Sequence, residues 1–380
     1  MTNRQLKTLY DLIQGRIEEV NTYYLRKVAE QIAEIGTLSQ SRVNLLVQMR
    51  RAGASVAEIK RRLENATRLN QQDIQRIFEQ VADDAYTDAE FMYYVRGVEP
   101  PPFGQNLALQ SMVRAIARQT AGTMANYARS TIIGRAYREA VTDAVQAVVS
   151  GVTDYNSAIR DTLRRTAKDG IRVTYESGYT RRLDTAVRQN VINGVRQINQ
   201  QGAIIMGEQI GADGYELSAH PNSAPDHEPV QGRVLDKANF ELMQQGVGFY
   251  DVDGRRYQGF ERPISEWNCR HFASPFLLNV STRRYTPEQL DKWAEDNAKG
   301  CTIGGKHYTT YEASQKMREI ETAIRGQRDI ADMAKRTGDD VLKRECQAKI
   351  TRLRAQYNAV ARAAGLRKEY DRAYVRINAG

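Results

Sequence analysis

Residues 6–28, LKTLYDLIQGRIEEVNTYYLRKV, indicate that this chain is helical. Their apolar side chains recur at steps of three and four residues, the spacing that places side chains on one face of an α-helix. Polar and charged residues occupy most of the positions between them. The pattern therefore predicts a long amphipathic helix near the N-terminus. Its apolar stripe comprises Leu6, Leu9, Ile13, Ile17, Val20, Tyr24 and Val28.

Similar periodicity predicts helices over most of the remaining sequence, interrupted by segments of different composition. The prolines and glycine of VEPPPFGQ cannot continue a helix and indicate a linker. In GIRVTYESG, residues 170–178, β-branched and aromatic residues alternate with polar ones, which predicts a short strand or an irregular loop. We expect five regions: an N-terminal helical region (1–97), a linker (98–105), a central helical region (106–210), a small α+β domain (211–300) and a basic helical tail (301–380).

The predicted fold class is therefore α+β and mostly α-helical, with long N- and C-terminal helices flanking the small domain. Short-range signals predict where several helices begin. SVAE at residues 55–58 has the form of a capping box and predicts a helix start. Thr286-Pro287 predicts a second helix start, and Thr309 with Glu312 forms another capping box. From there the tail runs to about Ala363 without sustained heptads, which favours a pair of amphipathic helices over a coiled coil.

All four histidines lie between residues 220 and 307, and three of them form a pattern with a cysteine inside the predicted α+β domain. The pattern consists of HPNSAPDH at residues 220–227, Gln231-Gly232, and CRH at residues 269–271. Imidazole and thiolate groups are costly to bury without partners, so their grouping indicates a specialised part of the fold. The candidate site residues are His220, His227, Cys269 and His271.

Three interpretations of this pattern stay open. Four nitrogen and sulfur ligands would satisfy tetrahedral Zn²⁺ with no open position, which describes a structural zinc site. The same histidines would equally serve a metal-free core in which they bridge loops through backbone carbonyls. In a catalytic site, Cys269 would be the nucleophile, with His227 or His271 as base and Asp226 as orienting group. The spacing matches no standard zinc finger, and no glycine-rich oxyanion or phosphate loop accompanies Cys269.

Composition limits the class of protein. The 380 residues are 41% hydrophobic and have a mean hydropathy of −0.60, and no apolar run is long enough to span a bilayer. The first residues contain no apolar signal core, and three scattered cysteines make no disulfide framework, which fits synthesis in a reducing cytoplasm. The net charge is +9, with an excess of seven from Lys316 onward, where 16 Lys and Arg stand against 9 Asp and Glu. With no sequence-reading motif, we expect any nucleic-acid contact to be with backbone phosphates alone.

Several motifs carry a resemblance to a known family. The histidine pattern contributes SAHP at 218–221, PDH at 225–227 and NCRH at 268–271. The preceding sequence from Ser150-Gly151 to Gly194-Val195 and the later YEASQKMREIE at 311–321 extend the likeness. In these stretches, roughly residues 105–376, the chain resembles the minor capsid protein 2 family of tailed phages. That family is related to the head-morphogenesis proteins typified by phage Mu.

The resemblance implies a structural protein of the virion that is made in the host cytoplasm and does not act as an enzyme. It implies several copies at the portal vertex, usually inside the head, in contact with the portal protein and other head proteins. It also implies roles in head assembly, genome packaging or DNA delivery. No membrane partner is implied, and zinc is the one cofactor that the residues suggest.

Two departures from the family pattern favour a structural role for the histidine loop. Ala224 stands where an arginine is expected, and Val230 stands where an aromatic residue is common. The alternative from another class is a head-carried enzyme, such as a nuclease or transferase, that uses the His/Cys cluster. A third hypothesis is a cytoplasmic nucleic-acid-binding protein that is absent from particles.

Overall fold

A computed structural model describes residues 3–35, 42–131, 133, 135–137, 139–142, 155–260, 262, 264–265 and 269–373. The chain divides into two compact units, each assembled from segments far apart in the sequence. The unit that contains the His/Cys pattern, here called the mixed unit, comprises Met1–Leu9, Gln71–Gly122 and Gln189–Ser314. The helical unit comprises Tyr10–Asn70, Thr123–Arg188 and Gln315–Gly380.

The helical unit contains most of the predicted N-terminal helix, α1 (Asn3–Ile35), from Tyr10 onward. The prediction is confirmed, because the stripe from Ile13 to Val28 is buried with at most 5% exposure at each apolar position. The side chains of Leu6 and Leu9 lie outside those described. The next helix, α2 (Arg42–Ala89), is tied to α1 by a hydrogen bond of 3.2 Å from Asn70 Nδ2 to the Ile13 carbonyl oxygen.

The helix start predicted at residues 55–58 is wrong, because α2 runs through this segment without a break. Val56, Ile59 and Leu63 are buried at the three- and four-residue steps of a continuing helix. Ser and Glu are tolerated inside a helix, and burial of the apolar stripe outweighs the local capping preference. The capping signature therefore lies inside a helix and does not mark a helix end.

A short hairpin follows α6 (Tyr155–Asp169) in the helical unit. Strands β1 (Arg172–Thr174) and β2 (Thr180–Arg182) pair antiparallel, so the strand alternative for residues 170–178 is confirmed for its central part. Gly170 enters the hairpin with φ +53°, and a Cβ placed there would lie 2.6 Å from Asn21 Oδ1. That oxygen accepts a hydrogen bond from the backbone N–H of Ile171, so the turn needs glycine. Residues 143–154 of the predicted central helical region lie outside the described residues.

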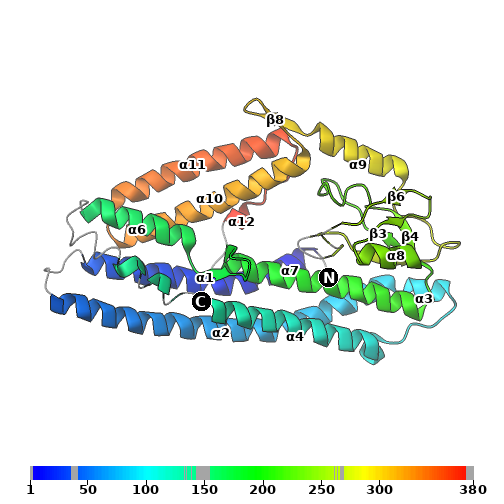
Figure 1. The fold of residues 1–380 in the computed structure, drawn as a ribbon, viewed down its shortest axis with the longest axis horizontal. Helices are drawn as coiled ribbons and strands as arrows, with labels where there is room; N and C mark the ends of the chain where they lie inside the picture. Colours follow the sequence, from blue (N-terminus) through cyan, green and yellow to red (C-terminus); the bar gives the residue numbers. More distant parts are fainter. Residues whose placement is uncertain are drawn as a thin grey trace. The chain divides into compact units, whose positions relative to one another are not determined.

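The tail is an antiparallel pair of helices, α10 (Thr310–Arg336) and α11 (Asp340–Ala363), followed by the short α12 (Tyr370–Ala373); Figure 1 shows the pair side by side. The predicted capping box is confirmed: Thr309 Oγ1 accepts from the Glu312 backbone N–H at 3.1 Å, and Glu312 Oε2 accepts from the Thr309 backbone N–H at 2.8 Å. The helix pair and its end near residue 363 are confirmed as well.

The mixed unit contains short strands and helices around its own core. From residue 71 it includes the end of α2, then α3 (Phe91–Val95), the 3₁₀ turn η1 (Phe103–Gln105) and the first part of α4 (Leu107–Ser130). The remaining elements are most of α7 (Leu183–Gln209), β3 (Gly214–Leu217), β4 (Val234–Asp236), α8 (Lys237–Gln244), β5 (Phe249–Tyr250), β6 (Arg256–Tyr257), β7 (Ala273–Phe276), α9 (Pro287–Lys299), β8 (Cys301–Ile303) and β9 (Lys306–Tyr308).

The centre of the mixed unit is an antiparallel sheet in the order β4-β3-β7, against which α8 lies in Figure 1. Its apolar core includes Tyr215, Leu217, Val230, Leu235, Phe240, Phe249 and Cys269. The predicted start of α9 is confirmed, since Thr286 accepts a hydrogen bond from the Gln289 backbone N–H and Pro287 is the first helical residue. The α+β, mostly α-helical fold class is likewise confirmed.

Among the described residues, none of the helices combines the length and the apolar character that crossing a bilayer requires.

Candidate metal centre

The sheet explains how two segments about forty residues apart reach one place. Strands β3 and β7 pair with Leu217 opposite Ala273, so the chain leaving β3 meets the chain entering β7. The Ser218 backbone N–H donates to the Phe272 carbonyl oxygen at 2.8 Å, which continues the pairing beyond the strands. The His loop (residues 218–233) and the Cys-x-His segment (269–271) are thereby brought together.

Within the His loop, a tight turn presents His227 to the interior. The Ala224 carbonyl oxygen accepts hydrogen bonds from the backbone N–H groups of His227 at 3.0 Å and Glu228 at 2.9 Å. Val230 in the same turn is 2% exposed and packs into the apolar core, so the smaller residue at this position fills a core site. The His227 side chain is fully buried.

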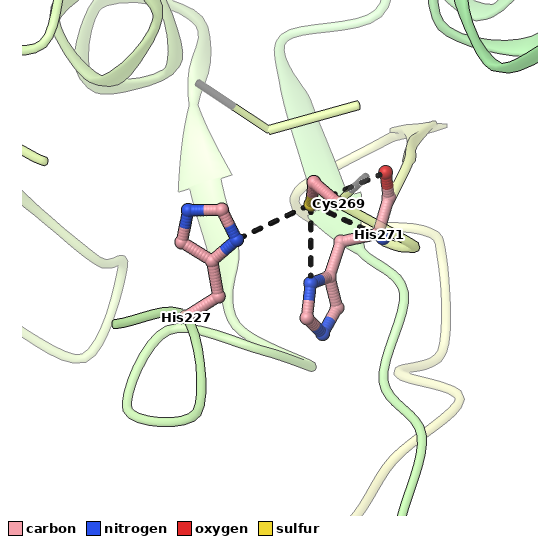
Figure 2. A group of neighbouring side chains, drawn as sticks. All are labelled: His227, Cys269 and His271. Atoms are coloured by element: carbon pink, nitrogen blue, oxygen red, sulfur yellow. Dashed lines mark hydrogen bonds between the residues drawn. The ribbon is translucent and has the colours of Figure 1, made fainter. Parts of the chain in front are cut away.

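Three of the four predicted side chains converge on one point, as Figure 2 shows. Cys269 Sγ lies 3.2 Å from His227 Nδ1 and 3.4 Å from His271 Nδ1. The three donor atoms all lie within 4.8 Å of one another. None of the three residues is more than 2% exposed. The structure therefore supplies a buried group of two nitrogen donors and one sulfur donor.

In both converging imidazoles, the Nε2 atom, which is not the one that faces Cys269, has a polar contact of its own. His227 Nε2 lies 2.7 Å from the Arg262 carbonyl oxygen, and His271 Nε2 lies 3.2 Å from Gln231 Oε1. Ser223 Oγ lies 3.3 Å from the same His271 nitrogen. Contacts of this kind fix the tautomer and orientation of ligand histidines in metal sites.

The fourth predicted residue, His220, stands beside this group. Its ring stacks on that of His271, with centroids 4.6 Å apart and planes 15° apart. Its Nδ1 lies 3.0 Å from the Pro221 carbonyl oxygen, and its backbone N–H donates to Gln231 Oε1 at 3.0 Å. The structure thus brings together His227, Cys269 and His271 and places His220 against them.

Burial keeps the three converging groups neutral in the metal-free arrangement. It lowers the pKa of His271 to about 3, with smaller contributions from His220 and His227. Burial also lowers the pKa of His227 and raises the pKa of the Cys269 thiol. Neutral imidazole is the form that binds a metal ion, whereas the thiol must lose its proton to do so.

Several supporting residues were not predicted from the sequence. Gln200, on α7, accepts through Oε1 from the Ala273 backbone N–H at 2.9 Å, and the same oxygen lies 3.1 Å from Ser265 Oγ. Ser265 has φ +69°, a backbone conformation uncommon for a residue with a side chain, and it donates to the His271 carbonyl oxygen at 2.7 Å. These roles follow from tertiary contacts, and only the position of Ser265 near the Cys-x-His segment offered a local signal.

Asp226, the orienting group of the catalytic interpretation, is paired elsewhere. Arg262 holds it through two contacts, Nη2 to Oδ1 at 2.6 Å and Nε to Oδ2 at 2.9 Å. The carboxylate lies 3.7 Å from His227 Nε2, beyond hydrogen-bonding distance. Asn268, part of the sequence pattern, lies outside the described residues.

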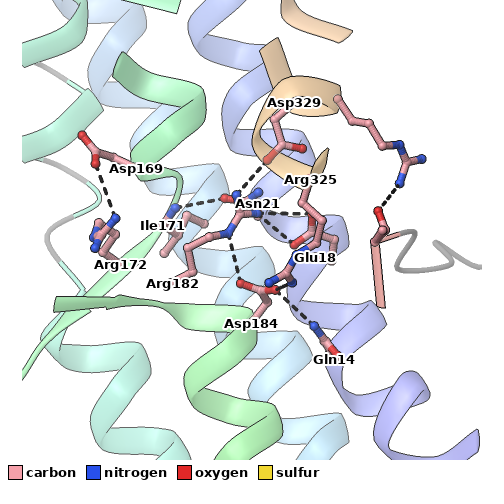
Figure 3. Close-up of polar contacts among 12 residues, drawn as sticks. Gln14, Glu18, Asn21, Asp169, Ile171, Arg172, Arg182, Asp184, Arg325 and Asp329 are labelled. Atoms are coloured by element: carbon pink, nitrogen blue, oxygen red, sulfur yellow. Dashed lines mark hydrogen bonds and ion pairs between the residues drawn. The ribbon is translucent and has the colours of Figure 1, made fainter. Parts of the chain in front are cut away.

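The helical unit contains a second buried polar cluster, shown in Figure 3. Arg182, at the end of β2, contacts Asp329 Oδ2 at 2.8 Å, Asp184 Oδ1 at 3.3 Å and Glu18 Oε2 at 3.3 Å. Arg325 contacts the other oxygen of Asp184 at 2.9 Å. These residues come from α1, β2, α7 and α10, so the cluster joins distant segments of one unit. The ion pairs of Arg182 and Arg325 with the aspartates connect these segments, which indicates a structural role.

Comparison with known proteins bears on most of the chain. The family model described as phage minor capsid protein 2 matches residues 1–360. Neither the curated proteins nor the solved structures include a match. The family match confirms the resemblance indicated by the His/Cys motifs, and it extends that resemblance to the N-terminal helices.

Proposed function

This chain belongs to the phage minor capsid protein 2 family, and from that membership we propose that it acts at the portal vertex of a tailed-phage head. As a member of a minor capsid family it is a structural component of the virion. The proposed site of action is the inner face of the vertex, where several copies contact the portal protein. There the protein would contribute to head assembly, genome packaging or DNA delivery.

The observation that carries the proposal is a run of exposed apolar side chains between residues 91 and 107. Phe91 is 52% exposed, Tyr94 63% and Leu107 74%. Val95 and Val98 are exposed in the same segment. We call these five residues the apolar edge. Exposed aromatic and aliphatic side chains in one segment are typical of protein–protein contact surfaces.

The backbone beneath the apolar edge is firmly held, so its exposure is not the result of fraying. Arg96 donates to the carbonyl oxygens of Ile210 at 3.1 Å and Gly211 at 2.8 Å. Tyr86 Oη donates to the Pro101 carbonyl oxygen at 2.6 Å. Because these contacts fix the segment, its exposed side chains form a preorganised surface that loses little entropy on binding.

Contact with packaged DNA is supported by the charge of α11. Its exposed side chains include Arg344, Lys349, Arg352, Arg354 and Arg362. The buried face of the same helix, with Leu342, Cys346 and Tyr357, packs into the helical unit. A helix whose exposed side chains include many cations and few anions suits phosphate backbones and carries no sequence preference.

The proposal is tested in purified particles assembled with all other phage proteins. The triple variant Phe91→Ser, Tyr94→Ser, Leu107→Ser replaces the native chain. The matched control is Tyr250→Ser, Val252→Ser, Val280→Ser, which removes three exposed apolar side chains from the same unit. The measurements are copies per particle by quantitative mass spectrometry and the position of the chain by electron cryomicroscopy.

Burying one large apolar side chain stabilises a contact by about 1.5–3 kcal/mol. Loss of three is therefore expected to reduce incorporation by at least about tenfold, while the control is incorporated normally. Wild-type protein missing from particles would contradict the virion role. Wild-type density away from the portal, or full incorporation of the apolar-edge variant, would contradict the proposed contact.

An enzyme carried in the head is the second candidate, and one geometric feature favours it. Cys269 Sγ faces His227 Nδ1 at 3.2 Å, a separation typical of a nucleophile and its base. Two features oppose it: Cys269 is 2% exposed and His227 is fully buried, so no substrate reaches them in this conformation. Burial also raises the thiol pKa, whereas reactive cysteines have a lowered one.

A further inference from the structure

In the buried group of His227, Cys269 and His271, the lone pairs that face one another outnumber the protons available to form hydrogen bonds between them. The Arg262 carbonyl oxygen, 2.7 Å from His227 Nε2, can only accept a hydrogen bond. His227 Nε2 must therefore carry the ring proton. In the neutral ring this leaves a lone pair on Nδ1, which faces Cys269 Sγ at 3.2 Å.

The same reasoning about the ring proton applies to His271. The His220 backbone N–H donates to Gln231 Oε1 at 3.0 Å, which fixes that side-chain atom as the amide oxygen. The oxygen in turn accepts from His271 Nε2 at 3.2 Å. His271 Nδ1 is thus also left with a lone pair, and it faces the same sulfur at 3.4 Å.

One thiol proton cannot satisfy two ring nitrogens. With Cys269 as a thiol, one of the two Nδ1 atoms is left as a buried acceptor without a donor from this group. Moving the proton from sulfur to one ring leaves the lone pair of the other ring facing a thiolate. An additional proton would satisfy both rings but would place a net positive charge among residues that are at most 2% exposed. A divalent cation at the centre accepts all three lone pairs at once.

We propose that His227, Cys269 and His271 bind a zinc ion through Nδ1, Sγ and Nδ1. Tetrahedral zinc, with bonds of about 2.3 Å to sulfur and about 2.0–2.1 Å to nitrogen, separates a sulfur from a nitrogen ligand by about 3.6 Å. The present separations of 3.2 and 3.4 Å need little adjustment to admit the ion. Mixed nitrogen and sulfur donors select zinc over magnesium or calcium, which prefer oxygen.

The ion would join two segments that secondary structure alone leaves separate. His227 lies on the loop after β3, and the other two ligands lie on the approach to β7. His220 is the candidate for the fourth ligand, because its Nδ1 proton is directed to the Pro221 carbonyl oxygen and its buried Nε2 has no hydrogen-bond partner among the described residues. A site closed by four protein ligands is structural.

The test is metal analysis of the purified full-length protein, by mass spectrometry and by titration with zinc against a chromogenic chelator. Wild type is expected to hold one zinc per chain and to show a thiolate-to-metal charge-transfer band when loaded with cobalt. Cys269→Ser is expected to lose that band and more than about tenfold in zinc affinity. Cys301→Ser and His307→Asn are matched controls, because both residues lie in the mixed unit but outside the donor group.

Wild-type protein that stays below stoichiometric zinc after incubation with excess metal would overturn the proposal, and this measurement requires no variant to fold. The proposal would also fail if Cys269→Ser and Cys301→Ser bound zinc equally well. Neither result bears on incorporation into particles, so this test is independent of the proposed portal contact.

Discussion

Replacing Glu18 by glutamine is expected to stabilise the protein at neutral pH, although it removes a carboxyl group from the buried ion cluster. Burial, followed by the charge of Asp184, raises the pKa of Glu18 to about 8 against the attraction of Arg182. The side chain therefore keeps its proton in the folded protein at pH 7. The distances support this protonation state. Arg182 Nη2 lies 3.4 and 3.3 Å from Glu18 Oε1 and Oε2, whereas Arg182 Nη1 lies 2.8 Å from Asp329 Oδ2. Only the shorter distance is typical of a charge-assisted hydrogen bond.

The magnitude follows from linkage. In the unfolded chain Glu18 titrates near pH 4.5, so between pH 4.5 and 8 the folded state holds more protons than the unfolded state. The free energy of unfolding therefore falls as pH rises through this window, by about 1.4 kcal/mol per pH unit. The loss amounts to about 3 kcal/mol at pH 7. Glutamine has the shape of the protonated acid and does not titrate, so Glu18→Gln removes this loss.

The assay is equilibrium unfolding in urea at pH 5, 6, 7 and 8 for wild type and Glu18→Gln. The difference between the two proteins cancels the contribution of titrating groups that lie away from the ion cluster, and it reports on Glu18 together with its coupling to Asp184 and Asp329. We expect a difference below about 1 kcal/mol at pH 5 that grows to about 3 kcal/mol in favour of the variant at pH 7. Glu345→Gln, which alters an exposed ion pair with Arg164, should stay within about 0.5 kcal/mol at every pH. A Glu18→Gln variant that is equally destabilised at pH 5 and pH 8 would show that Glu18 is ionised in the folded protein and would refute the reasoning.

Three further predictions concern the same two units. Arg182→Met should lower the free energy of unfolding by about 3–5 kcal/mol, since two buried aspartates lose their shared cation; a loss below 1 kcal/mol in urea unfolding would contradict the ion-cluster description. Gly170→Ala should cost about 1–3 kcal/mol, because its Cβ meets Asn21 Oδ1 at 2.6 Å in a left-handed backbone conformation; an unchanged melting temperature would count against this. His220→Phe should keep the stack on His271 while reducing zinc affinity by about tenfold or more, and unaltered affinity in the chelator titration would exclude His220 as a ligand.

Local patterns in the sequence were sufficient where a single segment decides its own conformation. The stripe from Ile13 to Val28 predicted α1, because helix periodicity and burial are expressed in the same few turns. The Thr309–Glu312 capping box and the Thr286-Pro287 start were predicted for the same reason, since each requires only neighbouring backbone groups. The identical kind of signal at residues 55–58 failed, because burial of a continuing stripe in α2 overrode it.

The candidate site was predicted only in part. The residue types of the His/Cys pattern predicted a specialised site in this part of the chain. The structure brings His227, Cys269 and His271 together there. Sequence spacing could not distinguish these three residues from His220, because that choice depends on how each ring is oriented by a distant partner. For His271 the partner is Gln231, and for His227 it is the Arg262 carbonyl oxygen.

The mostly helical fold class, the ends of several helices, the family and the residue types available for a site could all be inferred from the amino-acid sequence. The assembly of segments into each unit, and the side chains that meet inside them, depend on long-range contacts. The antiparallel pairing of β3 with β7 places the His loop beside the Cys-x-His segment, and Gln200 arrives from α7. Periodicity and caps are short-range properties of a chain, whereas strand pairing and buried hydrogen bonds join residues that lie far apart in the sequence and leave no local pattern.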